Sequence, residues 1–337
     1  MDWLANHLGE LASLGAALCW VFTSMAFAAA GRRIGPTAVN LIRIFLAVLV
    51  LLCIHRAVFS DWMPQVEARG LILLGVSGLI GLVIGDQCFL IALVDVGPRL
   101  TLLLATLAPP MAAILAWPML DERLGGVQIA GIMVTLAGIA WVVLERPDTS
   151  AGTPARRRHR LRGIICGGLG GVCQATGLVL SKLGMGHVPG EEMNATATVD
   201  PWSATLVRMV FAAGGIAILA TSLRLGRRTM RASRNVAGNA LAVGSGNRRA
   251  KPLGIAMLMV CVGVALGPVL GVWCSMVGVD RAEAGVAATL MAMSPVFILP
   301  LAVVFERERV SPRAALGAMI AVAGVALLTI MNGSNGY

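Results

Sequence analysis

The chain has 337 residues, of which 57% are hydrophobic and only 13% are charged, and its mean hydropathy is +0.83. Soluble domains carry about 25% charged residues, so this chain has too little polar material to cover a soluble fold of its size. An ordinary soluble protein is excluded, and we expect an integral membrane protein. The formal net charge of +10 comes mostly from arginines in short segments between apolar runs, a pattern typical of membrane loops rather than of nucleic-acid binding.

Ten continuous apolar runs of roughly 17 to 25 residues could each cross a bilayer core of about 30 Å as a helix. In chain order they lie at about 11–30, 38–58, 70–93, 99–119, 126–144, 163–181, 203–223, 254–279, 284–305 and 313–331. Helices are favoured because backbone polar groups in hydrocarbon must be satisfied within the segment. We expect a basic polar linker at 147–162 between a first unit, 1–146, and a second unit, 163–337. A long Arg-rich loop is expected at 224–252.

The two units are related in sequence. One constant shift of the sequence against itself, which we call the repeat shift, aligns Gly81 with Gly267, Gly85 with Gly271, Cys88 with Cys274, Pro109 with Pro295 and Glu122 with Glu308. A second, smaller shift aligns LIRIFLA, which contains Arg43, with LVRMVFA, which contains Arg208. The first and sixth spans align only loosely. The second to fifth spans therefore have counterparts in the second unit.

Five spans per unit bring the second copy into the membrane from the opposite side. We therefore predict an all-α membrane protein with ten transmembrane helices in two inverted five-helix repeats. Such repeats are common in secondary transporters, because two near-equivalent arrangements of the same parts can open the midplane to either side in turn. The alternative is a duplication that merely builds a larger helix bundle.

Two stretches carry a proline in the fourth or ninth span, a glutamate before the fifth or tenth, and glycines along the latter. They are LATLAPPMAAILAWPMLDERLGGVQIAGIMVTLAGIAWVV and LMAMSPVFILPLAVVFERERVSPRAALGAMIAVAGVALL. Both resemble the second part of an EamA domain, and nearly the whole chain is similar to ten-helix members of the drug/metabolite transporter superfamily. The resemblance implies two EamA repeats, membrane transport and a central cavity near the third and eighth spans, but no particular solute. Asp121 and Arg307 depart from the pattern, where glycine commonly precedes the glutamate.

Asp86, in GLVIGDQCFL, lies well inside the third span. A carboxylate there costs about 2.5–3.5 kcal/mol on insertion scales, so a retained one usually serves a substrate or ion path. We expect it to bind substrate or couple transport to protons. A structural hydrogen bond to a neighbouring helix is the alternative. Its counterpart is Val272, so the acid is not part of the common scaffold.

Other polar or amphipathic groups at membrane depth are candidates for substrate binding. They are Trp20, Gln87, Gln174, Thr176 and Trp273. Gln87 and Trp273 gain support from their corresponding positions in the third and eighth spans. Hydrogen bonds between membrane helices average only about 0.6 kcal/mol, so ordinary helix packing explains these residues nearly as well.

Arg43 and Arg208 lie roughly 9 Å inside their helix starts. This depth is within the snorkelling reach of arginine, so an interfacial anchor is the preferred interpretation and a gate or anion contact the alternative. Pro109 and Pro295 interrupt the fourth and ninth spans, where they have a gating or merely structural role. Glu122 and Glu308 are interpreted as structural, because they lie where helices begin.

Charge and resemblance disagree about orientation. Twenty Lys and Arg residues lie in loops on the side opposite the termini, against five on the side of the termini. The positive-inside rule then places both termini outside, whereas the resemblance implies cytoplasmic termini. We favour the charge count; a reporter fused after Tyr337 that is active only in the cytoplasm would contradict it. The Arg-rich loops are expected to meet anionic lipid headgroups.

The functional hypothesis is a secondary transporter in the cell (inner) membrane. It moves a small organic metabolite, amino acid-like or another small solute or drug, by alternating access, and the resemblance suggests efflux. The alternatives are a non-transporting scaffold and an intramembrane enzyme, although no nucleophile or HExxH pattern supports the enzyme. The seven cysteines lie in apolar runs without CxxC spacing, so no cofactor, metal site or disulfide framework is expected. Proton coupling, and a monomer or homodimer, are left open.

Overall fold

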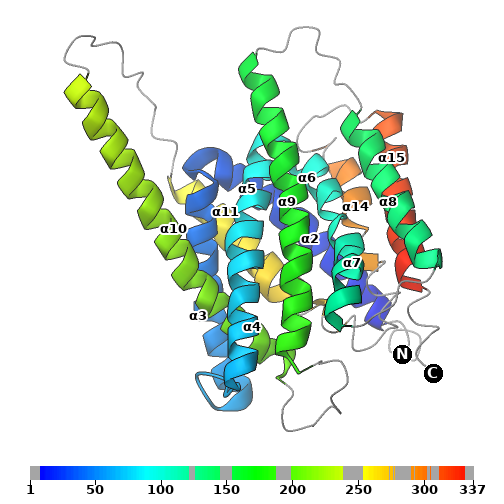
Figure 1. The fold of residues 1–337 in the computed structure, drawn as a ribbon, viewed down its shortest axis with the longest axis horizontal. Coiled ribbons are helices and arrows are strands. Elements are labelled where there is room, and N and C mark those ends of the chain that lie inside the picture. The colour runs from blue at the N-terminus through cyan, green and yellow to red at the C-terminus, as the bar shows by residue number, and fades with distance from the viewer. Residues whose placement is uncertain are drawn as a thin grey trace.

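The computed structural model describes residues 8–120, 126–144, 154–186, 199–237, 253–272, 274–275, 277, 290–291, 293–301, 304 and 311–330, in which the regular elements are all helices (Figure 1). The elements are α2 (Leu8–Ile34), α3 (Pro36–Phe59), α4 (Ala68–Gly78), η1 (Leu79–Gly85), α5 (Asp86–Asp95), α6 (Gly97–Ala105), α7 (Ala108–Leu120), α8 (Gly126–Leu144), α9 (Pro154–Gly184), α10 (Pro201–Ala237), α11 (Leu253–Val264), η2 (Ala265–Gly271), α14 (Ser294–Leu301) and α15 (Pro312–Ile330). The segments η1 and η2 are π-helices: η1 lies between α4 and α5, and η2 directly follows α11.

Seven helical stretches of the described chain are long and apolar enough to cross a membrane. They correspond to the first four predicted spans and to the sixth, seventh and eighth. The predicted fifth and tenth spans coincide with α8 and α15, whose apolar parts are shorter. The ninth is described in part, by α14. An all-helical, multi-pass membrane architecture is therefore confirmed.

Two helices extend beyond the spans expected for them. The structure begins α9 at Pro154, within the expected linker, and continues α10 to Ala237, within the expected Arg-rich loop. The remainder of that loop, 238–252, lies outside the described residues. The end of an apolar run marks where a helix leaves hydrocarbon, not where it stops. Arginine, alanine and methionine are good helix formers, and proline is tolerated in a first turn.

Prolines divide the fourth span. The break between α6 and α7 precedes Pro109 and Pro110, which have no N–H to donate to the carbonyls of Ala105 and Thr106. The N–H groups of the two intervening residues donate instead to carbonyls three residues earlier, at 3.1 Å. The same arrangement recurs at Pro295, where α14 begins one residue earlier after a turn. Both prolines thus lie in the first turn of a helix that starts inside the apolar layer.

The two π-helices follow the sequence repeat. The repeat shift, which aligns Gly85 with Gly271, also aligns Leu79 with Ala265, so that η1 and η2 begin and end at equivalent residues. The N–H of Asp86, after η1, donates to the carbonyl of Gly81, and the N–H of Val272, after η2, donates to the carbonyl of Gly267. The same local backbone therefore stands at equivalent places in both units.

Helices α8 and α15 pack against each other through equivalent glycines. A Cβ on Gly138 would lie 2.8 Å from the carbonyl oxygen of Gly317, and one on Gly324 would lie 2.8 Å from that of Gly131. The repeat shift converts one contact into the other. The later glycine of each helix meets the earlier glycine of its partner, so the two helices run antiparallel, as Figure 1 also shows.

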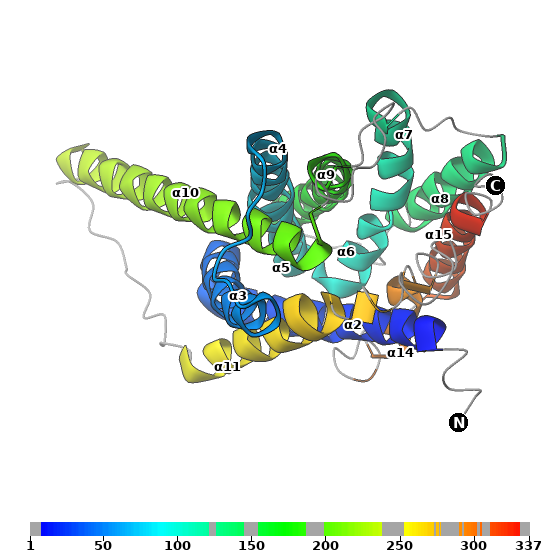
Figure 2. The ribbon, with the colours of Figure 1, turned by 90° about the horizontal axis from the view of Figure 1, so that it is seen from below.

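A second pair of equivalent contacts relates α2 to α9, although the sequences of these two helices align only loosely. A Cβ on Gly85 would lie 3.0 Å from Cys173 Cβ of α9, and one on Gly271 would lie 3.3 Å from Cys19 Cβ of α2. These contacts pair the third span with the sixth and the eighth with the first. Figure 2 shows α2 beside α11 along one side of the bundle, with α4 and α9 across from them. Equivalence of the two contacts aligns Cys19 of α2 with Cys173 of α9.

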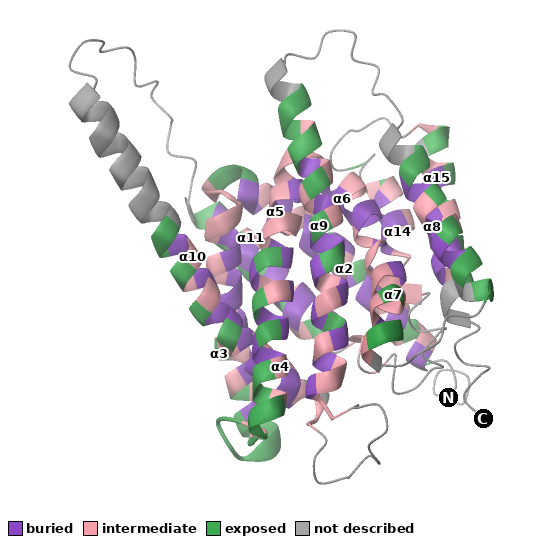
Figure 3. Cartoon of the chain, viewed as in Figure 1, coloured by how far each residue is buried: buried purple, intermediate pink, exposed green. Residues whose placement is uncertain are grey.

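The apolar side chains divide between a core and an outer surface. The largest core cluster lies where α2, α3, α5, α10 and α11 meet. Its buried members include Phe27, Leu51, Leu90, Leu206 and Val260. Many large apolar side chains remain exposed on the outside of the bundle, as the green segments of Figure 3 show. An exposed apolar surface around the bundle fits lipid contact, because lipid tails are as apolar as leucine.

Candidate functional site

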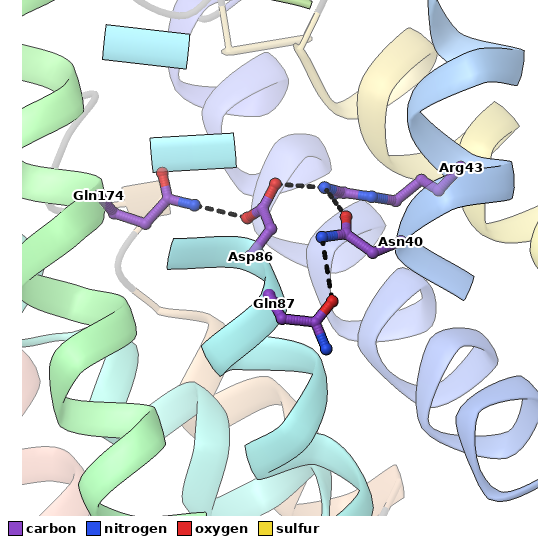
Figure 4. A network of polar contacts seen from close by, with 5 residues as sticks. All are labelled: Asn40, Arg43, Asp86, Gln87 and Gln174. Carbon is purple, nitrogen blue, oxygen red and sulfur yellow. Dashed lines mark hydrogen bonds and ion pairs between the residues drawn. The ribbon is translucent and has the colours of Figure 1, made fainter. Parts of the chain in front are cut away.

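Asp86 is buried at the start of α5, directly after η1, and only 6% of its surface is exposed. Both carboxylate oxygens are bound (Figure 4). Oδ2 forms an ion pair with the Arg43 guanidinium, and Oδ1 accepts a hydrogen bond from Gln174 Nε2 at 2.6 Å. Arg43 belongs to α3 and Gln174 to α9, so this carboxylate joins helices of both units.

Arg43 points into the bundle and is only 7% exposed. Its Nη2 also donates to Asn40 Oδ1 at 3.1 Å, and its guanidinium carbon lies 5.6 Å from the centroid of the Phe27 ring. The structure therefore does not place Arg43 as an interfacial anchor. Snorkelling reach alone predicted the anchor, but a buried carboxylate within reach of the side chain outweighs the drive toward the interface.

The contacts continue through amides to a hydroxyl. Asn40 Nδ2 donates to Gln87 Oε1 at 3.5 Å, and Gln87 Nε2 donates to Thr37 Oγ1 at 3.0 Å. We name this group the polar cluster, and its members are Thr37, Asn40, Arg43, Asp86, Gln87 and Gln174. The sequence interpretation missed Thr37 and Asn40. Their spacing with Arg43, three residues apart on one helix face, is the signal that could have found them.

The polar cluster provides hydrogen-bond partners for two buried charges, the Asp86 carboxylate and the Arg43 guanidinium. Removing a carboxylate and a guanidinium from water costs several kcal/mol each, which mutual attraction offsets only when further hydrogen bonds complete both ions. Gln174 completes Asp86, and Asn40 helps to complete Arg43. Arg43 Nε has no hydrogen-bond partner in the described part of the chain. The polar cluster therefore holds an ion pair inside the bundle.

Arg208 reaches the π-helix that precedes Asp86. Its backbone carbonyl is at the crossing of α10 and α4, where a Cβ on Gly78 would collide with it. Its Nη2 lies 3.5 Å from the place where a Cβ on Gly81 or Gly177 would stand. Among the described residues, its Nε has no hydrogen-bond partner. Arg208 therefore also points into the bundle, between η1 and α9.

The other candidates that the structure describes lie outside the polar cluster. Trp20 is half-buried on α2 and forms none of the hydrogen bonds of the polar cluster. The alignment of Cys19 with Cys173 makes Trp20 the equivalent of Gln174 in the first unit. Thr176 donates to a carbonyl of its own helix at 2.9 Å. Trp273, Glu122 and Glu308 lie outside the described residues.

A second ionic contact joins the end of α5 to the first half of α9. Arg162 Nε and Nη2 donate to the two carboxylate oxygens of Asp95 at 2.6 and 2.7 Å. His159 Nδ1 lies 3.4 Å from Asp95 Oδ1. The Asp95 side chain is only 4% exposed. A Cβ on Gly163 would lie 2.8 Å from the Cβ of Asp95, so a glycine at this position leaves room for the Asp95 side chain. Such a two-point pair fixes orientation as well as distance.

Replacing Asp95 with Asn should lower the free energy of unfolding by about 1.5–3 kcal/mol, because charge-assisted hydrogen bonds to a buried carboxylate are lost. Thermal unfolding of purified protein in detergent measures the change. The matched control is Asp61→Asn, since Asp61 is exposed and only its backbone carbonyl contacts His55. Equal midpoints for the two variants would show that the Asp95–Arg162 pair does not hold α5 to α9.

The model of the EamA-like transporter family matches residues 7–144 and again 161–330. The chain belongs to the EamA-like transporter family. The resemblance drawn from the sequence is thereby confirmed, and the protein is an integral, multi-pass membrane transporter of small solutes. EamA proteins are transporters and not enzymes, which supports a non-enzymatic function.

Solved structures share the fold of this EamA protein. One, described only as "Crystal structure of protein", covers 98% of this chain and 99% of its own, with a TM-score of 0.55 and 20% sequence identity. A likeness at this identity shows the fold alone. No curated protein matches the chain. The solute must therefore be inferred from the residues of the site.

Proposed function

We propose that this EamA protein is a secondary transporter that exports a small organic solute by alternating access between two inverted five-helix units. Support comes from equivalent structure in the two units: the π-helices at equivalent positions of the repeat, and the antiparallel α8 and α15 joined by equivalent glycines. Two copies of one unit in opposite directions allow two near-equivalent arrangements, each open to one side.

The observation that carries the proposal is the bonding of Asp86. Its carboxylate belongs to the first unit and accepts a hydrogen bond from Gln174 of the second, inside membrane-spanning helices. Any motion of one unit against the other must break or change this contact. Binding of a substrate or a proton at this buried acid can therefore change how the two units are arranged.

Proton coupling follows from the same contact. A proton and the Arg43 guanidinium compete for the Asp86 carboxylate, because either one neutralises it. In this proposal, protonated Asp86 releases Arg43 and loosens the contact between α3 and α5. Gln87 and Asn40 then have amide groups available to a solute, since each is hydrogen-bonded only within the polar cluster.

Counterflow in sealed proteoliposomes tests the proposal. Purified protein is first screened for thermal stabilisation by amino acids, sugars, nucleosides and cationic drugs, and the strongest stabiliser is loaded into the vesicles unlabelled. We expect labelled compound outside to accumulate transiently and to be recovered unmodified. No accumulation above protein-free vesicles would contradict transport and favour a scaffold, and chemical conversion of the compound would favour an intramembrane enzyme.

A further inference from the structure

Among the described residues, the charges inside the membrane-spanning helices do not balance. Arg162 and Asp95 form a pair of their own at the edge of the apolar runs. Well inside these runs, the charged residues of the described spans are Arg43, Arg208 and Asp86. Arg43 forms an ion pair with Asp86, which leaves one positive charge in this part of the bundle. An isolated guanidinium at such depth is costly, so it is retained where it has a partner or a function.

Arg43 has an acidic partner, Asp86, and the sequence repeat shows that Arg208 lacks the equivalent acid. Arg43 and Arg208 are equivalent positions under the smaller shift, and Asp86 and Val272 are equivalent under the repeat shift. Where the first unit has the carboxylate of Asp86, the second unit has the apolar side chain of Val272. Asp86 is the acid whose field acts on Arg208, but its two oxygens already bind Arg43 and Gln174.

The surroundings of Arg208 suit a ligand. The guanidinium lies against Gly81 and Gly177, so no side chain from η1 or α9 covers it at these positions. Part of the Arg208 surface stays accessible, whereas Arg43 is only 7% exposed. Its Nε is buried and has no hydrogen-bond partner in the described part of the chain. The planar guanidinium matches carboxylate and phosphate groups.

We propose that Arg208 is the anion-binding residue of this transporter and that the solute carries a carboxylate. A single unbalanced positive charge matches a single negative charge, which favours a carboxylate over a doubly charged phosphate monoester. This proposal rests on the proposed function, because the bound anion is a solute only if the protein transports it. Binding of the anion between η1, α9 and α10 neutralises the Arg208 guanidinium, so the loaded site costs less in the low-dielectric bundle than the empty one.

The first test needs no ligand. We expect Arg208→Gln to unfold at a temperature equal to or above that of the wild type, because it removes a buried charge that forms no ion pair within the described residues. Arg43→Gln should unfold at a lower temperature, because it leaves Asp86 without its ion pair. The exposed Arg56 provides the control variant Arg56→Gln. If Arg208→Gln lost as much stability as Arg43→Gln, Arg208 would have a structural partner and the proposal would be overturned.

The second test uses pairs of compounds that differ in charge: benzoate with benzamide, and phenylalanine with phenylalaninamide, together with phenyl phosphate and inorganic phosphate. We expect a carboxylate to raise the unfolding temperature of the wild type, and its amide not to. Arg208→Gln should weaken this binding by about ten- to a hundredfold, and Arg208→Lys by less. No stabilising carboxylate, equal effects of the amides, a preference for the phosphates, or unchanged binding to Arg208→Gln would overturn the proposal.

These measurements record binding in detergent and do not depend on transport. If counterflow failed while carboxylates still bound through Arg208, only the proposed transport would be wrong. If counterflow succeeded with a neutral or cationic solute and Arg208→Gln transported it normally, only the anion site would be wrong.

Discussion

Asp86→Asn is expected to abolish proton-driven solute movement and to lower the free energy of unfolding by about 3–5 kcal/mol, the usual cost of removing one partner of a buried ion pair. The amide can still accept a hydrogen bond from Gln174, but it cannot neutralise Arg43. Two uncompensated guanidinium groups then remain among the described spans. Thermal unfolding and pH-gradient-driven uptake into proteoliposomes measure the two effects.

A second variant separates stability from coupling. Asp86→Asn combined with Arg43→Gln restores the charge balance of the wild type, so a substantial part of the lost stability should return. Transport driven by the gradient should not return, because no carboxylate remains at this position to exchange protons. Wild-type proton-driven transport in either variant would show that Asp86 is a structural residue alone. The exposed Asp61→Asn is the control for loss of a single acid.

Gly324→Ala is expected to separate α15 from α8 and to cost about 3 kcal/mol, at the upper end of overpacking effects. The added Cβ would collide with Thr135 N and would lie 2.8 Å from the Gly131 carbonyl oxygen. Backbone atoms of a regular helix cannot rotate away as a side chain can. Gly138→Ala should be about as damaging, since its Cβ would lie 2.5 Å from Ala321 N.

The control for this series is Gly214→Ala on α10, where no atom lies within 4 Å of the added Cβ. Its effect should be within about 1 kcal/mol, the ordinary difference between glycine and alanine in a helix. The unfolding temperature in detergent and the yield of folded protein compare the variants. If Gly324→Ala behaved like Gly214→Ala, the glycine contacts would not hold the two helices together.

Hydropathy and self-similarity were sufficient for most of the fold. Long apolar runs can only be helices in hydrocarbon, and seven of the ten predicted spans match long apolar helices of the described chain. The repeat was readable because glycines and prolines act through the backbone and recur at one spacing. The π-helices were not predicted, because they depend on which helices pack against them, and no composition marks them before packing is known.

The polar cluster was predicted only in part. Asp86, Gln87 and Gln174 were candidates because an acid or amide at membrane depth is costly wherever it points. Their partners were not predictable, since contacts between α3, α5 and α9 join residues far apart in the chain. Thr37 and Asn40 are less costly in a membrane than an acid, and so they were overlooked.

By itself, the sequence determined that this protein is helical, lies in a membrane and consists of two related units, because the transfer of each side chain and backbone group into lipid is a local cost. Only the tertiary structure decided that Arg43, and not an interface, neutralises Asp86, and that Arg208 points between η1 and α9 instead of toward an acid of its own. Pairing of charges depends on distances across helices, which no local cost encodes.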